Sequence, residues 1–190
     1  APDASQLLAP PGSAGGQRGE PMSDPRLTVV VGDALEQADV DKVLQHGAQG
    51  VVIAVRENRS QVTANVIAGM RRVGAKRVSV VTSLGTGDSK AQSPLHLNNF
   101  LMRRTLREWY EDENNQEALF TNATGPGSDL EYTILRPADM TLDAPSGRVR
   151  VAHGVVKGTI PRADVADWCL QAVLEDSFEH IRQTPCIVAA

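Results

Sequence analysis

The chain has 190 residues and a formal net charge of −4; 41% of its residues are hydrophobic and 4% are aromatic. This length fits one domain with a single core, no apolar run approaches the ~18–20 residues of a membrane-spanning helix, and a mildly acidic chain has no bulk attraction to nucleic acid. Two cysteines, Cys169 and Cys186, match no metal-binding spacing and are too few for a disulfide scaffold. We therefore expect no metal, no nucleic-acid or membrane partner, and a reducing, cytoplasmic location.

Residues 1–26 differ from the rest of the chain because they are rich in Pro, Gly, Ala and Ser. They contain too little apolar surface to offset the loss of chain entropy on folding. We therefore predict a flexible tail, followed by one α/β domain over residues 27–190. The tail contains the spacing Gly12-x-x-Gly15, but no strand precedes it, and residues 20–26 are too few for a helix and a strand. We expect no phosphate-binding loop there.

From Leu27 onward, short apolar runs alternate with amphipathic stretches. The expected strands are 27–31, 50–55, 77–82, 131–136 and 185–189, and 149–151 is expected to pair with 155–160 as a hairpin. The expected helices are 39–45, one that Ser60 caps and Gly74 ends, 97–119, and 163–174. Strands that alternate with helices are typical of an α/β fold with a mostly parallel sheet flanked by helices.

Chemically useful residues follow the expected strands. In parallel sheets, ligands bind beyond the carboxyl ends of the strands. Gly32 and Asp33 follow the first strand, Arg56 the second, Ser83 the third and Pro137 the fourth. Gly32 allows a ligand to approach the backbone, Asp33 can accept hydrogen bonds, and Ser83 offers a hydroxyl. We expect these positions to form the binding site.

Four segments carry a family resemblance: VVVGDALEQADVDKVL, VTS, SDLEYTILRPADMT and IPRADVADWCLQAVL. Together, from Leu27 to Glu175, they resemble the atypical short-chain dehydrogenase/reductases, and within that group the NAD(P)H-binding flavin reductase / biliverdin-IX-beta reductase type. The resemblance implies a Rossmann-like fold, NADP or NAD as cofactor, and a small-molecule acceptor. It places Ser83 near the nicotinamide as the catalytic residue and Arg162 at the substrate mouth. The implied cofactor-binding residues are Gly32, Asp33, Val55, Arg56, Ser83, Pro137 and Ala138.

Two features of the family are absent from the sequence. Residues 27–31 align with the family's third strand, so the N-terminal βαβ unit with its glycine-rich turn is reduced or missing. The usual catalytic Tyr with a Lys four residues later is also missing, because Tyr110 is followed at that spacing by Asn114 and Tyr132 by Arg136. A flavin-like or quinone-like acceptor is already electrophilic, so its reduction depends more on positioning than on a strong acid.

Three hypotheses remain open. The first is an NAD(P)H-dependent reductase that transfers hydride to a flavin-like or quinone-like acceptor. The second is a non-catalytic dinucleotide-fold sensor, regulator or interaction protein, since both the glycine-rich turn and the Tyr-Lys pair are absent. The third adds self-association through an exposed sheet edge at Val29–Val31, because missing strands would leave backbone groups unpaired there. The choice between NAD and NADP is undecided, because the family's second strand carries it.

Overall fold

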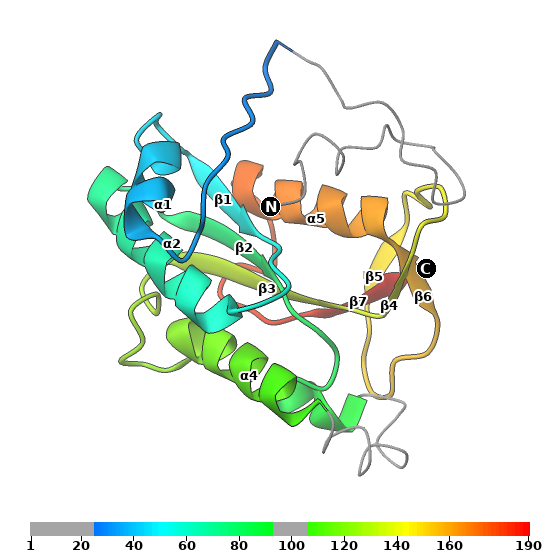
Figure 1. Ribbon diagram of the computed structural model, residues 1–190. Coiled ribbons are helices and arrows are strands. Elements are labelled where there is room, and N and C mark those ends of the chain that lie inside the picture. Colours follow the sequence, from blue (N-terminus) through cyan, green and yellow to red (C-terminus); the bar gives the residue numbers. More distant parts are fainter. Residues whose placement is uncertain (1–24, 93–105) are drawn as a thin grey trace.

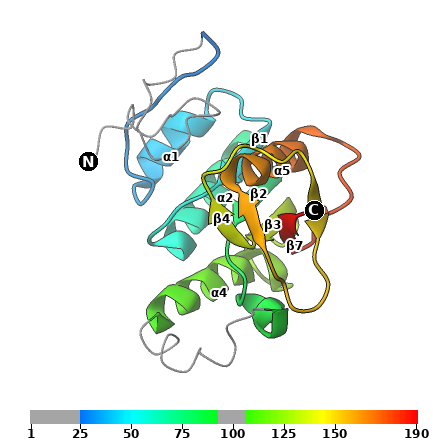
Figure 2. The same cartoon turned by 90° about the vertical axis from the view of Figure 1, so that its right-hand side faces the viewer.

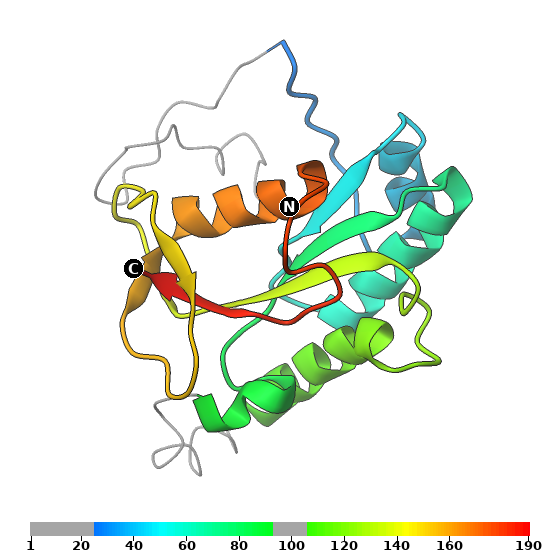
Figure 3. The ribbon, with the colours of Figure 1, turned by 180° about the vertical axis from the view of Figure 1, so that it is seen from behind.

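The computed structural model describes residues 25–92 and 106–190. At its centre lies a five-stranded sheet in the order β1-β2-β3-β7-β5 (Figure 1). Its strands are β1 Gly50–Ile53, β2 Arg77–Val81, β3 Glu131–Pro137, β5 Val149–Val151 and β7 Cys186–Ala189. The first four strands in this order are parallel, and β5 runs antiparallel to β7 (Figure 3). A separate parallel pair consists of β4, Asp139–Thr141, and β6, Thr159–Pro161.

Helices cover both faces of the sheet. They are α1 Gln37–Leu44, α2 Arg59–Val73, α4 Arg107–Thr121 and α5 Arg162–Leu174, with a short 3-10 helix, η2, at Gly87–Gln92. The helix α5 lies on one face, whereas α1, α2 and α4 lie on the other (Figure 1 and Figure 2). This arrangement confirms the expected α/β fold with a mostly parallel sheet between helices.

The central strands send alternate side chains into two cores. Val80 and Ile134 pack in the core under α2 and α4, whereas Leu135 packs in the core under α5. Because both faces are covered, β3 is buried from Tyr132 to Pro137, as expected for a strand of a parallel sheet. The sheet is therefore a rigid base that carries the loops at its carboxyl end.

The helix α2 begins differently from our expectation. The sequence predicts Ser60 as its N-cap, but the N-cap residue is Asn58, in the left-handed region at φ 51°. The free N–H groups of Arg59 and Ser60 donate instead to the carboxylate of Asp112 on α4, at 2.7 and 3.1 Å. Gly74 ends the helix at φ 75°, as predicted. A carboxylate from another helix thus provides the cap.

Most expected elements are confirmed within one to three residues. The structure contains the strands expected at 50–55, 77–82, 131–136 and 185–189, and the helices expected at 39–45, after Ser60 and at 163–174. Residues 97–105 of the expected helix 97–119 lie outside the described residues, and the remainder forms α4. Residues 1–24 of the expected tail, with Gly12 and Gly15, also lie outside the described residues.

The prediction of a strand at residues 27–31 is wrong. This segment pairs with no strand among residues 25–92 and 106–190, and the side chains of Leu27, Val29 and Val31 are 40, 50 and 77% exposed. An apolar run becomes a strand only beside a hydrogen-bonding neighbour. The two edge strands of the sheet are β1 and β5, which within the described ranges pair only with β2 and β7. Self-association through an edge remains a prediction, but Val29–Val31 does not form that edge.

The hairpin expected from 149–151 and 155–160 is also wrong. Val149–Val151 pairs with β7 and Thr159–Pro161 pairs with β4, so the two segments belong to different sheets. Their partners lie further away in the sequence.

In the described part of the chain, no helix is long and apolar enough to cross a membrane. No group of three or more His, Cys, Asp and Glu residues in this part could hold a metal ion.

Candidate functional site

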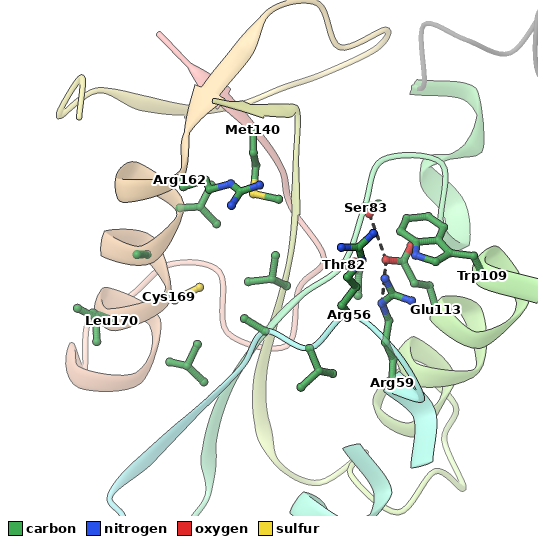
Figure 4. A pocket seen from close by; sticks show the side chains of 16 residues that line it. Arg56, Arg59, Thr82, Ser83, Trp109, Glu113, Met140, Arg162, Cys169 and Leu170 are labelled. Carbon is green, nitrogen blue, oxygen red and sulfur yellow. Dashed lines mark hydrogen bonds and ion pairs between the residues drawn. The ribbon is translucent and has the colours of Figure 1, made fainter. Parts of the chain in front are cut away.

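A cavity of about 630 Å³ opens at the carboxyl ends of β1 and β2 (Figure 4). Apolar side chains from the end of β1 and from α5 form much of its wall, and α4 contributes Trp109 and Glu113. The lining residues are Val52, Ala54, Val55, Arg56, Arg59, Val81, Thr82, Ser83, Trp109, Glu113, Met140, Arg162, Val165, Ala166, Cys169 and Leu170. The location agrees with the general position of ligand sites in parallel sheets.

The loop after β2 positions the hydroxyl of Ser83. The N–H of Thr82 donates to the carbonyl of Leu135 at 2.9 Å, which holds the chain beside β3 for one more residue. The loop then turns at Gly85 and Gly87, whose φ angles are +93° and +56°. This turn brings Ser83 to the cavity wall, where its hydroxyl lies 3.1 Å from Oε1 of Glu113.

Glu113 is a carboxyl group buried at the cavity wall, with 2% of its side chain exposed. Its Oε2 accepts a hydrogen bond from the Thr86 hydroxyl at 2.8 Å, and Nε of Arg59 lies 3.5 Å from its Oε1. Burial raises the pKa of Glu113, and the neighbouring charge of Glu117 adds to this, while Thr86, Arg59 and Ser83 oppose the rise without cancelling it. The group therefore holds its proton more strongly than an exposed glutamate.

One helical turn later, Glu117 forms a different kind of site. Arg136 donates to both of its oxygens, at 3.0 Å from Nε and 2.5 Å from Nη2, and the Thr82 hydroxyl donates at 2.8 Å. Both side chains are 4% exposed, and Arg136 also pairs with Asp88. This ion pair joins β3 to α4, so Glu117 has a structural role.

Arg59 links α2 to the same cluster. Its guanidinium lies over the ring of Trp109, with 4.6 Å between its central carbon and the ring centroid. Figure 4 shows Arg59, Trp109, Glu113 and Ser83 on one side of the cavity, opposite Cys169 and the rest of α5. The cavity thus combines a polar side, which contains a hydroxyl and a buried acid, with an apolar side.

The structure brings together four of the residues predicted for the site. Val55, Arg56, Ser83 and Arg162 all line the 630 Å³ cavity. The side chains of Arg56 and Arg162 are exposed, and neither forms an ion pair with another described residue.

The other predicted site residues lie elsewhere. Gly32 and Asp33 line a second cavity of about 240 Å³ beside α1. Oδ1 of Asp33 accepts a hydrogen bond from the N–H of Leu35 at 2.9 Å, so this carboxylate stabilises a local turn. Pro137 and Ala138 are buried and line neither cavity. Their roles as cofactor-binding residues remain predictions.

Several lining residues were missed by the sequence analysis. Arg59, Trp109, Glu113 and Cys169 come from helices rather than from strand ends. One signal was present: Trp109 and Glu113 are four residues apart, the spacing that places two side chains on one face of a helix. The same spacing separates the Tyr and Lys that the family resemblance implies and the sequence lacks.

Residues 17–176, most of the chain, match the family model of NAD(P)H-binding proteins. The chain belongs to this NAD(P)H-binding family. Its cofactor is therefore NAD(P), as the sequence predicted. No curated protein matches the sequence.

Three proteins are among those whose solved structures resemble this NAD(P)H-binding protein. ChuY, an anaerobillin reductase from Escherichia coli O157:H7, is 21% identical with a TM-score of 0.66, covering 83% of this chain and 73% of ChuY. A short-chain dehydrogenase/reductase from Veillonella parvula DSM 2008 in complex with NADP is 17% identical with a TM-score of 0.69, covering 87 and 73%. A Rossmann-fold NAD(P)-binding family protein from Shigella flexneri is 25% identical with a TM-score of 0.57, covering 84 and 69%. These likenesses show the Rossmann-like fold.

The cavity fits the nicotinamide end of such a cofactor. Its volume lies within the ~300–1,000 Å³ of cavities that hold small molecules and cofactors. Val55 and Val165 offer apolar contacts to a flat ring, Ser83 offers a hydroxyl, and Arg56 offers a cation for a phosphate. No strand precedes α1 in the described ranges. The glycine-rich turn of the family therefore has no counterpart among the described residues.

Proposed function

We propose that this protein is an NAD(P)H-dependent reductase that transfers hydride to a flat, electrophilic acceptor of flavin or quinone type. The observation that carries this proposal is the cavity at the carboxyl ends of β1 and β2, in which apolar walls meet the Ser83 hydroxyl and two exposed arginines. Membership of the NAD(P)H-binding family supports the choice of cofactor. The fold shared with a solved anaerobillin reductase is consistent with reductase activity.

The residues of the cavity have separable roles in this proposal. The reduced nicotinamide, when bound, supplies the hydride. Val55 and Val165 flank the flat ring and keep water from it, and Ser83 orients it through its hydroxyl. Arg56 binds a phosphate of the cofactor, and Arg162, at the other side of the mouth, binds an acidic group of the acceptor (Figure 4). Holding two flat rings face to face supplies most of the rate acceleration, because a near-attack arrangement replaces a bimolecular encounter.

A direct test mixes the purified chain with NADPH or NADH and with FMN or a soluble quinone, and follows the nicotinamide absorbance. We expect turnover with at least one acceptor, and the two cofactors compared at equal concentration decide between NADPH and NADH. Saturable cofactor binding without turnover on any flavin or quinone would contradict the reductase proposal, as would the absence of cofactor binding.

A non-catalytic NAD(P)H sensor or regulator is the second candidate. It is favoured by the geometry of α4, where the two residues that line the cavity at the Tyr-Lys spacing are Trp109 and Glu113. These positions thus carry an indole and a carboxyl group where the usual pair has a tyrosine hydroxyl and a lysine cation. Calorimetric titration with NADPH, combined with the turnover assay, separates this candidate from the first, since a sensor binds but does not turn over.

A further inference from the structure

A buried carboxyl group and a hydroxyl group lie side by side in the wall of the cavity of the proposed reductase. Oε1 of Glu113 lies 3.1 Å from the hydroxyl oxygen of Ser83, and both residues line the cavity. The second oxygen, Oε2, accepts a hydrogen bond from the Thr86 hydroxyl at 2.8 Å. In the structure the Ser83 hydroxyl donates to Oε1. When Glu113 carries its proton on Oε1, this hydrogen bond reverses and the proton points to the oxygen of Ser83.

From this geometry we propose that Glu113 is the proton store of the reductase and that Ser83 relays its proton to the reduced acceptor. The proposal rests on the function proposed above. Reduction of a flavin or quinone by hydride adds two electrons and leaves the acceptor one proton short. The Ser83 O–H bond breaks to supply that proton, and the Glu113 O–H bond breaks to restore the Ser83 hydroxyl. Glu113 is left as a carboxylate and takes a new proton from water after the product leaves.

The charged groups around Glu113 suit both states of this cycle. On α2, Arg59 stands 3.5 Å away, close enough to stabilise the carboxylate, and its guanidinium also contacts Trp109. On α4, the negative charge of Glu117 favours the protonated acid, and Arg136 of β3 partly neutralises that charge. The loop after β2 contributes the hydroxyls of Ser83 and Thr86. The pKa of Glu113 is raised by burial, which places it nearer to the working pH of a proton donor.

Glu117, one helical turn further along α4, differs from Glu113 in its partners and in its position relative to the cavity. Arg136 makes two hydrogen bonds to Glu117, so both oxygens of this carboxyl group are engaged in an ion pair. Arg59, by comparison, approaches only one oxygen of Glu113, at a distance longer than a strong hydrogen bond. Glu113 faces the cavity, whereas Glu117 is not among the residues that line it. One turn of α4 thus carries a glutamate fixed in a buried ion pair and a second glutamate that faces the cavity.

The test measures kcat with NADPH and FMN as a function of pH for the wild type, Glu113→Gln, Glu113→Asp and Ser83→Ala. We expect the wild-type kcat to fall as pH rises through the pKa of Glu113, and Glu113→Gln to lower kcat by about 100-fold and to remove this fall. We expect Glu113→Asp to retain part of the wild-type kcat and part of its fall with rising pH. Glu111→Gln, an exposed position on the same helix, is the matched control and behaves as the wild type.

A double variant shows whether the two groups act in one relay. Ser83→Ala combined with Glu113→Gln should be no slower than the worse single variant, because either change interrupts the same proton path. The affinity for NADPH, measured by calorimetry, should change less than about threefold in Glu113→Gln, as expected if the loss concerns the proton alone.

The outcomes that overturn the relay are distinct from those that overturn the reductase. If the wild type turns over and Glu113→Gln keeps its kcat and pH profile, the relay is wrong and the reductase stands. Multiplicative losses in the double variant would also contradict the relay. If Glu113→Gln does not fold, the pH profile of Ser83→Ala decides, because an unchanged fall in kcat at high pH is incompatible with the relay. If the wild type has no turnover, both proposals are wrong.

Discussion

Glu113 and Glu117 lie one helical turn apart on α4, yet their carboxyl groups have different partners. Glu117 receives two hydrogen bonds from Arg136 and one from Thr82. Glu113 receives hydroxyl hydrogen bonds and a more distant cation, and burial raises its pKa. At the scale of single residues, the site is therefore defined less by residue type than by which partners reach each carboxyl group.

Gly87 is the residue that allows the Arg136–Glu117 pair to close. Its φ is +56°, and a Cβ atom there would lie less than 3.0 Å from Nη2 of Arg136 and from Oε2 of Glu117. We predict that Gly87→Ala lowers the free energy of unfolding by about 2–4 kcal/mol, because left-handed strain adds to disruption of a buried ion pair. Urea unfolding measures this.

The matched control for that change is Gly74→Ala. Gly74 also has a positive φ, +75°, but a Cβ atom there meets no other atom within 4 Å. Its substitution should cost only about 1 kcal/mol of backbone strain. Equal losses for the two variants would show that the ion pair tolerates a methyl group and that our account of Gly87 is wrong.

Arg162 should distinguish acceptors that differ only in a phosphate. Because its exposed guanidinium lies at the cavity mouth, we predict that Arg162→Ala raises the KM for FMN about tenfold and leaves the KM for riboflavin within about twofold, consistent with loss of one charge-assisted hydrogen bond. Steady-state kinetics at saturating NADPH measure both values. Arg150→Ala, an exposed arginine of β5 that does not line the cavity, serves as the control. Equal effects on the two flavins would exclude a phosphate-binding role.

At the scale of elements, α2 depends on a carboxylate from α4. Asp112 accepts hydrogen bonds from the N–H groups of Arg59 and Ser60, and these bonds, with the Ser60 hydroxyl, lower its pKa against the effect of burial. We predict that Asp112→Asn lowers the free energy of unfolding by about 1–2 kcal/mol at pH 7.

The sign of the pH dependence follows from the lowered pKa of Asp112. Its stabilising contribution is fully present above the ordinary value of 3.8 and is lost as the pH falls through the lower folded value. The stability difference between wild type and Asp112→Asn should therefore shrink in acid below that folded value. Urea unfolding at a series of pH values checks this. A difference that grows in acid would contradict the capping role.

The local sequence predicted the helices and the positions of the central strands, but it did not predict which strands pair. The run at 50–55 and the run at 27–31 have similar composition. Only the first is a strand, because β2 lies beside it, whereas no strand of the described part of the chain pairs with the second. The segments 149–151 and 155–160 were expected to pair because they are close in the chain. The first pairs with β7 instead, and the end of the second belongs to β6, which pairs with β4. Strand pairing is a long-range property, and a short apolar run carries no information on its partner.

At the scale of the whole molecule, the sequence predicted the site residues that follow strands but not those that lie on helices. Val55, Arg56 and Ser83 could be found because the carboxyl end of a parallel sheet is where ligands bind. Trp109, Glu113 and Cys169 could not be placed, since their position at the cavity depends on how α4 and α5 pack on opposite faces of the sheet. Asp33 was also predicted for the site from its position after an expected strand. Its carboxylate instead accepts a hydrogen bond within the turn before α1.

The central claim is that reduction takes place in the cavity between α4 and α5. Ala166 lines this cavity on the exposed side of α5, whereas Ala163, on the same helix, is exposed but does not line it. Measuring kcat/KM for FMN with NADPH in Ala166→Trp and Ala163→Trp tests the claim most directly. We predict a loss of about tenfold or more for Ala166→Trp and no more than about a twofold change for Ala163→Trp, since only the first indole fills the cavity. Equal activity in the two variants would contradict the assignment of the site.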